Sequence, residues 1–173
     1  AQPLSPRGLA LRADALAASR QSAEAYALLG ALRQQQALPE AVRILQRARH
    51  VHVAGFRASY AAAHTLHYLY RLFRNSVSLI RGDAGLLEME LRALHPDDAV
   101  VIIGFAPYSQ ETMRVAEAAH NRGCRSIALC DSKVAPIARH ADPVLIVSTD
   151  TPHFFPSSVA ALALVVLVGG TRP

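Results

Sequence analysis

The sequence contains no tryptophan, and aromatic residues make up only 6% of its 173 residues. Its core must therefore be built mainly from alanine, leucine, valine and isoleucine, in keeping with a hydrophobic content of 51%. Charged residues are also few, at 18%, which excludes the composition of a disordered chain. A chain of this length and composition fits one globular domain with a sizeable core.

Lysine is nearly absent as well, because Lys133 is the only one in the chain. The net charge of +5 comes almost entirely from arginines, and these are scattered singly with no basic run. A basic chain can bind nucleic acid, but the scatter argues against direct DNA binding by these residues. A scattered basic surface or an anionic ligand explains the charge better.

The two cysteines, Cys124 and Cys130, lie at opposite ends of one predicted strand. At about 3.3 Å per residue they are roughly 20 Å apart, whereas a disulfide needs Cα atoms within about 7 Å. Two unpaired cysteines suit a reducing cytoplasm. Their spacing is not that of a zinc or redox site, and no histidine cluster supplies metal ligands, so we expect no metal and no cofactor.

Long apolar segments are missing too. The longest run, Val159 to Val168, is too short to span a bilayer. The first twelve residues lack the apolar segment of a signal peptide. We therefore expect a cytoplasmic protein with no membrane partner.

From His50 onward, short apolar runs alternate with amphipathic segments. The runs predict strands and the amphipathic segments predict helices. Predicted strands cover 50–54, 76–80, 99–104, 126–130 and 143–147; predicted helices cover 9–36, 39–48, 58–74, 85–94, 110–122 and 157–168. This alternation predicts a three-layer α/β/α fold with a five-stranded parallel sheet, preceded by N-terminal helices.

In such sheets a ligand lies outside the carboxyl ends of the strands, so the loops after the strands matter most. The first reads G-F-R-A-S, from Gly55 to Ser59. Gly55 allows a sharp turn, Arg57 adds a positive charge, and Ser59 stands before a helix whose free N–H groups face the loop. This is a candidate anion site. An ordinary serine cap with a surface arginine explains the same residues.

The third loop, Gly104 to Thr112, also leads into a helix, with Ser109 as its expected N-cap and Tyr108 beside it. Both loops belong to one edge of the sheet, and two helix starts at one crevice strengthen the prediction of an anion site. Asp131, after the fourth strand, either orients a ligand hydroxyl or caps the next turn. Ser157 either caps the last helix, reaches the ligand, or does both. The predicted ligand-binding residues are Gly55, Arg57, Ser59, Tyr108, Ser109, Asp131 and Ser157.

Several ordered motifs in the chain resemble one family. They are ARHVHVAGFRASY at 48–60, LHPDDAVVIIGFAPYS at 94–109, GCRSIALCDS at 123–132, PIARHADPVLIV at 136–147 and FFPSS at 154–158. Over about residues 40–169 the sequence resembles the sugar isomerase (SIS) domain of bacterial transcriptional regulators of the RpiR/MurR type.

The resemblance implies an effector-sensing domain that binds a phosphosugar or a related anionic metabolite and does not act as an enzyme. We expect residues 1–39 to form a linker or dimerisation helix and residues 40–173 to form the SIS effector-binding domain. Family members carry an N-terminal helix-turn-helix domain, so we expect this chain to be the effector-sensing part, with DNA contacted only through the missing domain. A homodimer or higher oligomer is expected because the apolar helix at 157–168 needs burial.

The sequence departs from the family pattern in the loop after the third strand. Phosphosugar-binding members usually carry S-x-S-G-x-T there, where this chain has Gly104, Ala106, Pro107 and Ser109. Two hydroxyls are lost, and proline has no N–H to offer. A carboxylate ligand is therefore an alternative to a sugar phosphate.

The alternative function is a sugar-phosphate isomerase on the same fold. Isomerisation needs a base that moves a proton between neighbouring carbons. The candidate bases are Glu88, Glu90, Glu111, His95 and His153. They form no recognisable pair of base and partner, so we assign no catalytic residue.

Overall fold

A computed structural model describes residues 36–150 and 157–170. Apart from its last residue, the helix predicted over 9–36 lies outside this part of the chain. The described residues all belong to one compact unit, Gln35–Pro173.

A single parallel sheet forms the centre of this unit. Its strands are β1 (Val51–Gly55), β2 (Val77–Ile80), β3 (Ala99–Ile103), β4 (Arg125–Cys130) and β5 (Val144–Ile146). All neighbouring strands run parallel, in the order β2-β1-β3-β4-β5. This confirms the predicted five-stranded parallel sheet. Each predicted strand is present, with its ends shifted by one residue at most.

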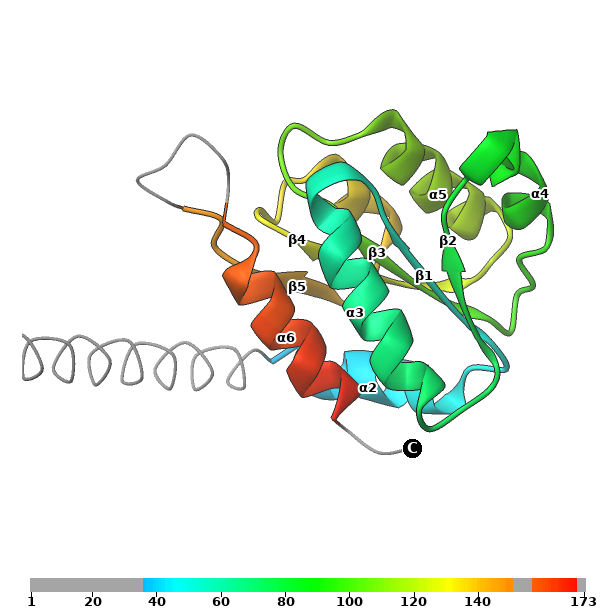
Figure 1. Cartoon of the computed structure of the whole chain (residues 1–173), viewed down its shortest axis with the longest axis horizontal. Helices are drawn as coiled ribbons and strands as arrows, with labels where there is room; N and C mark the ends of the chain where they lie inside the picture. Colours follow the sequence, from blue (N-terminus) through cyan, green and yellow to red (C-terminus); the bar gives the residue numbers. More distant parts are fainter. Residues whose placement is uncertain (1–35, 151–156, 171–173) are drawn as a thin grey trace, which may run out of the picture. The chain divides into compact units, whose positions relative to one another are not determined.

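Helices cover both faces of the sheet. They are α2 (Leu38–Arg47), α3 (Tyr60–Arg71), α4 (Leu87–Arg92), α5 (Gln110–Asn121) and α6 (Val159–Gly169). Figure 1 shows α3 and α6 side by side on one face of the sheet, with α4 and α5 on the other. The three-layer α/β/α architecture predicted from the sequence is therefore confirmed.

The apolar run of β3 is buried on both sides, as a strand between two helical layers must be. Val100 and Ile102 face the layer of α4 and α5, where they pack with Val115 and Ala116. Full burial of an isoleucine side chain such as Ile102 stabilises a fold by about 1.5–3 kcal/mol. The central strands thus contribute much of the stability on which the loops are mounted.

One arginine fastens the C-terminal end of α2 to the sheet. The Arg74 guanidinium donates to the backbone oxygens of Leu45 at 2.8 Å and Ala48 at 2.7 Å. The last carbonyls of a helix have no partner within the helix, so a cation placed here satisfies them and complements the helix dipole.

A buried carboxylate holds together the amino-terminal edge of the sheet. The Asp98 side chain is fully buried. Its Oδ2 accepts hydrogen bonds from the His95 backbone N–H at 2.9 Å and from Arg49 at 3.1 Å, and lies 3.1 Å from Nε2 of His52. Nδ1 of His52 in turn lies 2.9 Å from the Ser78 hydroxyl. These contacts join β1, β2 and the segment before β3.

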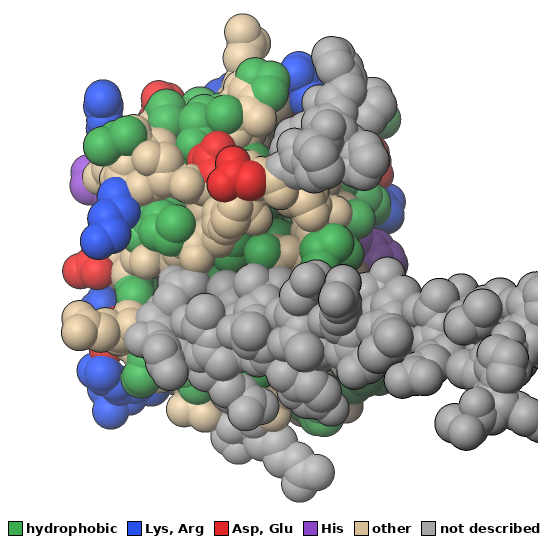
Figure 2. Space-filling model, turned by 90° about the vertical axis from the view of Figure 1, so that its left-hand side faces the viewer, with side chains coloured by type: hydrophobic (Ala, Val, Ile, Leu, Met, Phe, Trp, Pro, Cys, Tyr) green, Lys and Arg blue, Asp and Glu red, His purple; other side chains and the backbone are tan. Residues whose placement is uncertain are grey.

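The surface of this part of the chain carries its charges as separate groups. On the face shown in Figure 2, the visible Lys and Arg side chains stand apart from one another and form no continuous basic patch. Within 36–150 and 157–170, no helix has the length and apolar character needed to cross a bilayer.

Candidate functional site

The strand order reverses direction between β1 and β3, because the chain moves outward from β1 to β2 and then returns to β3 on the other side. At such a switch point the loops after the two strands separate and leave a crevice at the carboxyl edge of the sheet. The loops concerned are those after Gly55 and Ile103. They are the first and third loops of the sequence analysis.

A cavity of about 200 Å³ lies at this switch point. Residues 56–59 of the first loop form one side of it, and residues 104–107 with Ser109 and Thr112 form the other. The two loops predicted to share a crevice therefore do so. We call this cavity the switch-point cavity.

The first loop is a tight turn stabilised by a close backbone approach. A Cβ atom on Gly55 would lie 2.8 Å from the carbonyl oxygen of Ser59 and 2.9 Å from the Cβ of Ala63. Only glycine fits here, so Gly55 shapes the loop and does not itself line the cavity. Arg57 has a positive φ of 55°, a conformation that side chains rarely adopt. It begins a short 3-10 turn, Arg57–Ser59, which delays the start of α3 to Tyr60 instead of the predicted residue 58.

Ser59 differs from the expectation for a helix cap. It occupies the N-cap position of α3, but its backbone is helical and its side chain makes no capping hydrogen bond. The residue is only 4% exposed, and it lines the switch-point cavity. Within the described part of the chain its hydroxyl has no hydrogen-bond partner, and neither has the Arg57 guanidinium. Both groups are available to a ligand.

Ser109 caps α5 as predicted. Its Oγ accepts a hydrogen bond from the Thr112 backbone N–H at 3.1 Å and lies 2.9 Å from the Thr112 hydroxyl. The two hydroxyls are therefore bonded to each other. Ser109 lines the cavity, but its hydrogen-bonding capacity is largely used by the helix.

Asp131 holds the third loop in place. Its carboxylate accepts hydrogen bonds from the Ala106 backbone N–H at 3.2 Å and from the Tyr108 hydroxyl. Burial, the hydrogen bond and the negative charge of Asp131 together raise the pKa of Tyr108, so the phenol stays protonated as a donor. The expected capping role falls instead to Ser132, whose Oγ accepts from the Val134 N–H at 3.2 Å.

One further charge lies beside the cavity. The pKa of Glu111 is lowered by its own backbone N–H and by the Ser109 hydroxyl, with a smaller contribution from the charge of Arg57. Its carboxylate therefore stays ionised at the start of α5. Oε2 of Glu111 is buried and lacks a hydrogen-bond partner among the described residues.

The structure thus sorts the predicted ligand-binding residues into three groups. Arg57, Ser59 and Ser109 line the switch-point cavity. Gly55, Tyr108 and Asp131 shape or support its loops, and Ser157 lies outside the cavity lining, accepting a hydrogen bond from the Val159 N–H at 3.3 Å. Sequence reasoning missed the apolar lining, Phe56, Phe105 and Pro107. Their positions in the two chosen loops were the available signal.

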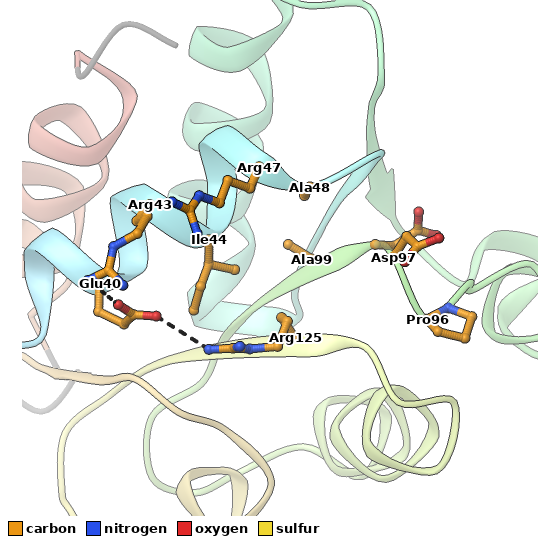
Figure 3. A pocket seen from close by; sticks show the side chains of 10 residues that line it. Glu40, Arg43, Ile44, Arg47, Ala48, Pro96, Asp97, Ala99 and Arg125 are labelled. Atoms are coloured by element: carbon orange, nitrogen blue, oxygen red, sulfur yellow. Dashed lines mark hydrogen bonds and ion pairs between the residues drawn. The ribbon is translucent and has the colours of Figure 1, made fainter.

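A second cavity, of about 300 Å³, lies near the amino-terminal edge of the sheet beneath α2. Figure 3 shows Arg43, Arg47 and Arg125 around it, with Glu40 linked to two of these arginines. The acidic groups Glu40, Asp97 and Asp98 balance the three arginines, and the Arg43 and Arg125 side chains are more than half exposed. Although it is larger, this cavity is at the edge away from the switch point, so we place the candidate site at the switch-point cavity.

Metal binding has no support in the described part of the chain. No group of three or more histidine, cysteine, aspartate or glutamate side chains there is arranged to hold a metal ion. Cys124 and Cys130 are both buried and unpaired, as expected, and burial raises the pKa of each thiol.

Comparisons with known proteins agree with this geometry. A family model described as SIS domain matches residues 44–169. No curated protein matches the sequence at a significant level. The sugar isomerase domain of an RpiR transcription factor from Sphaerobacter thermophilus is 29% identical, with a TM-score of 0.77 over 85% of this chain and 84% of that one.

Two more distant structures share the fold and contain ligands. The Vibrio vulnificus NanR protein, complexed with ManNAc-6P, is 18% identical, with a TM-score of 0.73 over 96% of this chain and 67% of that one. The c3406 protein of E. coli CFT073, in complex with a phosphosugar, is 17% identical, with a TM-score of 0.69 over 91% of this chain and 88% of that one.

Proposed function

The chain belongs to the SIS domain family, and from this premise we propose that it is the effector-sensing domain of a cytoplasmic bacterial transcriptional regulator. In this proposal residues 40–173 bind a small anionic metabolite and residues 1–39 form a linker or dimerisation helix. The observation that carries it is the pair Arg57 and Ser59. Both face the switch-point cavity, and neither has a hydrogen-bond or ion-pair partner among the described residues.

The chemistry of these two groups favours an anion. A guanidinium offers a planar fork of N–H donors that matches a carboxylate or a phosphate. The Ser59 hydroxyl adds a donor from a buried position, where it exchanges fewer hydrogen bonds with water. The similarity to an RpiR transcription factor supports a regulatory role, and the phosphosugar complexes of NanR and c3406 support an anionic ligand.

The alternative function, sugar-phosphate isomerisation, finds less support in the site. The comparisons include a Methanococcus jannaschii protein whose structure infers a 3-hexulose-6-phosphate isomerase function, at 14% identity. No acidic or histidine side chain among the described residues lines the switch-point cavity. Of the candidate bases, Glu88 pairs with Arg114 and Glu90 accepts from the Gly82 N–H. His153 lies outside the described residues, and Glu111 alone is beside the cavity.

A homodimer forms part of this proposal. Helix α6 is apolar on all sides, and Val159 and Val166 remain 63% and 52% exposed. On the adjacent helix α3, Tyr68 is 58% exposed, and Leu72 just beyond its end is 59% exposed. A helix that is hydrophobic all round is normally buried, which indicates that a second copy covers this surface.

The experiment that tests the ligand site is a metabolite screen followed by titration of the variants. Anionic metabolites that raise the melting temperature of the full 173-residue chain are titrated by calorimetry into the wild type, Ser59→Ala and Arg57→Lys. A hydrogen bond to a charged group is worth about 1.5–3 kcal/mol, so Ser59→Ala should weaken binding about ten- to a hundredfold. Because Ser59 does not cap α3, this substitution leaves the helix start unchanged.

Arg125→Lys is the matched control for Arg57→Lys, because Arg125 lines the other cavity. It should bind the ligand as tightly as the wild type does. Unchanged affinity in both Ser59→Ala and Arg57→Lys would show that the ligand binds elsewhere, and the assignment of the site would be wrong.

A further inference from the structure

The lining of the switch-point cavity is mainly apolar. Only Arg57, Ser59, Ser109 and Thr112 bring polar side-chain atoms to it. The remaining surface comes from phenylalanine, alanine, proline and glycine residues of the two loops. Phe105 is buried, and Phe56 packs partly buried against the core beneath. A ligand in this cavity therefore meets hydrocarbon over most of its surface.

Few hydrogen-bond donors remain for the ligand. The Ser109 and Thr112 hydroxyls are bonded to each other, at 2.9 Å. The Ala106 N–H donates to Asp131, the Gly104 N–H donates to the Leu129 oxygen at 3.1 Å, and Pro107 has no N–H. The donors left are the Ser59 hydroxyl and the Arg57 guanidinium.

This supply of donors suits a carboxylate better than a phosphate. A phosphate monoester presents three strong acceptor oxygens and about −1.5 to −2 charges at neutral pH. A carboxylate presents two oxygens and one charge, which one guanidinium fork can satisfy. The sugar hydroxyls of a phosphosugar would also lose their hydrogen bonds to water against an apolar wall, and that loss is costly.

The charge beside the cavity points in the same direction. The ionised Glu111 lies close enough to Arg57 for the two charges to interact. It offsets part of the attraction that the arginine exerts on any anion. The second negative charge of a phosphate is repelled in addition to the first, so a monoanion is favoured over a dianion.

The volume limits the size of the apolar body. A cavity of roughly 150 Å³ lined by apolar side chains holds a benzene molecule. The switch-point cavity, at about 200 Å³, has room for such a ring and a carboxylate beside it.

We propose that the switch-point cavity binds a monocarboxylate with an apolar body of about six to eight carbon atoms, such as an arylacetate or a branched aliphatic acid, in preference to a sugar phosphate. This inference rests on the proposed function, because it specifies the ligand of the same site.

The test compares four probes on the full chain by calorimetry, with chemical shifts of residues 56–59 and 104–112 reporting the place of binding. Phenylacetate combines the charge with the apolar body. Phenylacetamide lacks the charge, acetate lacks the body, and glucose 6-phosphate represents the sugar phosphates. Phenylacetate should bind most tightly, with the amide about ten- to a hundredfold weaker. Acetate and glucose 6-phosphate should bind more weakly than phenylacetate by at least tenfold.

A pair of variants tests the apolar wall directly. Ala106→Ser adds a hydroxyl and Pro107→Gly adds an N–H at the lip of the cavity. The double variant should shift the ratio of the phenylacetate and glucose 6-phosphate affinities toward the phosphate by about tenfold or more. Thr65→Ser, on the exposed side of α3, is the control and should leave the ratio unchanged.

The outcomes separate this inference from the function on which it rests. If the wild type binds glucose 6-phosphate more tightly than phenylacetate, and Arg57→Lys weakens that binding, the inference is overturned while the anion-sensing function stands. If no probe shifts residues 56–59 or 104–112 at millimolar concentrations, the inference is overturned and the proposed site loses its support as well.

Discussion

Replacing Asp98 by asparagine probes how the amino-terminal edge of the sheet is held together. Asp98 Oδ2 accepts from the His95 N–H at 2.9 Å and lies 3.1 Å from Nε2 of His52. It also receives Arg49, whose side chain is 56% exposed. Burial raises the pKa of Asp98, but the His95 N–H, His52 and Arg49 outweigh it and leave the pKa below its ordinary value. The carboxylate is therefore ionised in the folded protein.

The expected loss follows from these contacts. A hydrogen bond to a charged acceptor is worth about 1.5–3 kcal/mol and one to a neutral acceptor about 0.5–1.5 kcal/mol. Neutralising Asp98 weakens its two buried bonds by about 1 kcal/mol each. The contact with the exposed Arg49 adds no more than about 1 kcal/mol because water screens it. Asp98→Asn should therefore lower the free energy of unfolding by about 2–3 kcal/mol.

Urea denaturation followed by circular dichroism measures this change. With a slope of about 2 kcal/mol per molar urea, the midpoint should fall by about 1 M or slightly more. The neighbouring Asp97 is the control, because its side chain is 75% exposed. Asp97→Asn should change stability by less than about 0.5 kcal/mol. Equal midpoints for the two variants would refute the assignment of Asp98 as the anchor of this edge.

Three further predictions concern pH, loop geometry and assembly. Burial lowers the pKa of His52 below its ordinary 6.5, so the unfolded chain takes up a proton first and stability falls as the pH drops from about 7 through the folded pKa; His52→Gln should flatten this part of the pH profile in urea titrations. A second fall begins below the ordinary 3.8 of Asp98, whose pKa is also lowered. Gly55→Ala places a Cβ 2.8 Å from the Ser59 oxygen, so it should cost about 1–3 kcal/mol and weaken ligand binding, and unchanged affinity would show that the Ser59 position is not critical. Light scattering should show a dimer for the wild type and a monomer for Val166→Glu, whereas a wild-type monomer at tens of micromolar would contradict the proposed dimer.

The sequence alone determined the architecture of the folded unit. The unbroken apolar run at 99–104 predicts a strand covered on both faces, and β3 is one. The alternation with amphipathic segments predicts the parallel order, because parallel strands need helical crossovers. The choice of the first and third loops also followed from the sequence, since the carboxyl ends of parallel strands meet at one edge.

Only the tertiary structure decided the chemistry of that edge. Serine in front of a helix suggests a cap equally at Ser59 and Ser109, yet only Ser109 caps, because the positive φ of Arg57 begins a 3-10 turn ahead of α3. Asp131 turned out to hold the third loop, a role that depends on the Ala106 N–H 25 residues earlier in the chain. Hydrogen-bond partners are chosen by proximity in space, and local sequence carries little information about it. The donors left free at the cavity, and with them the kind of anion it can hold, are therefore set by the packing of loops that are distant in the chain.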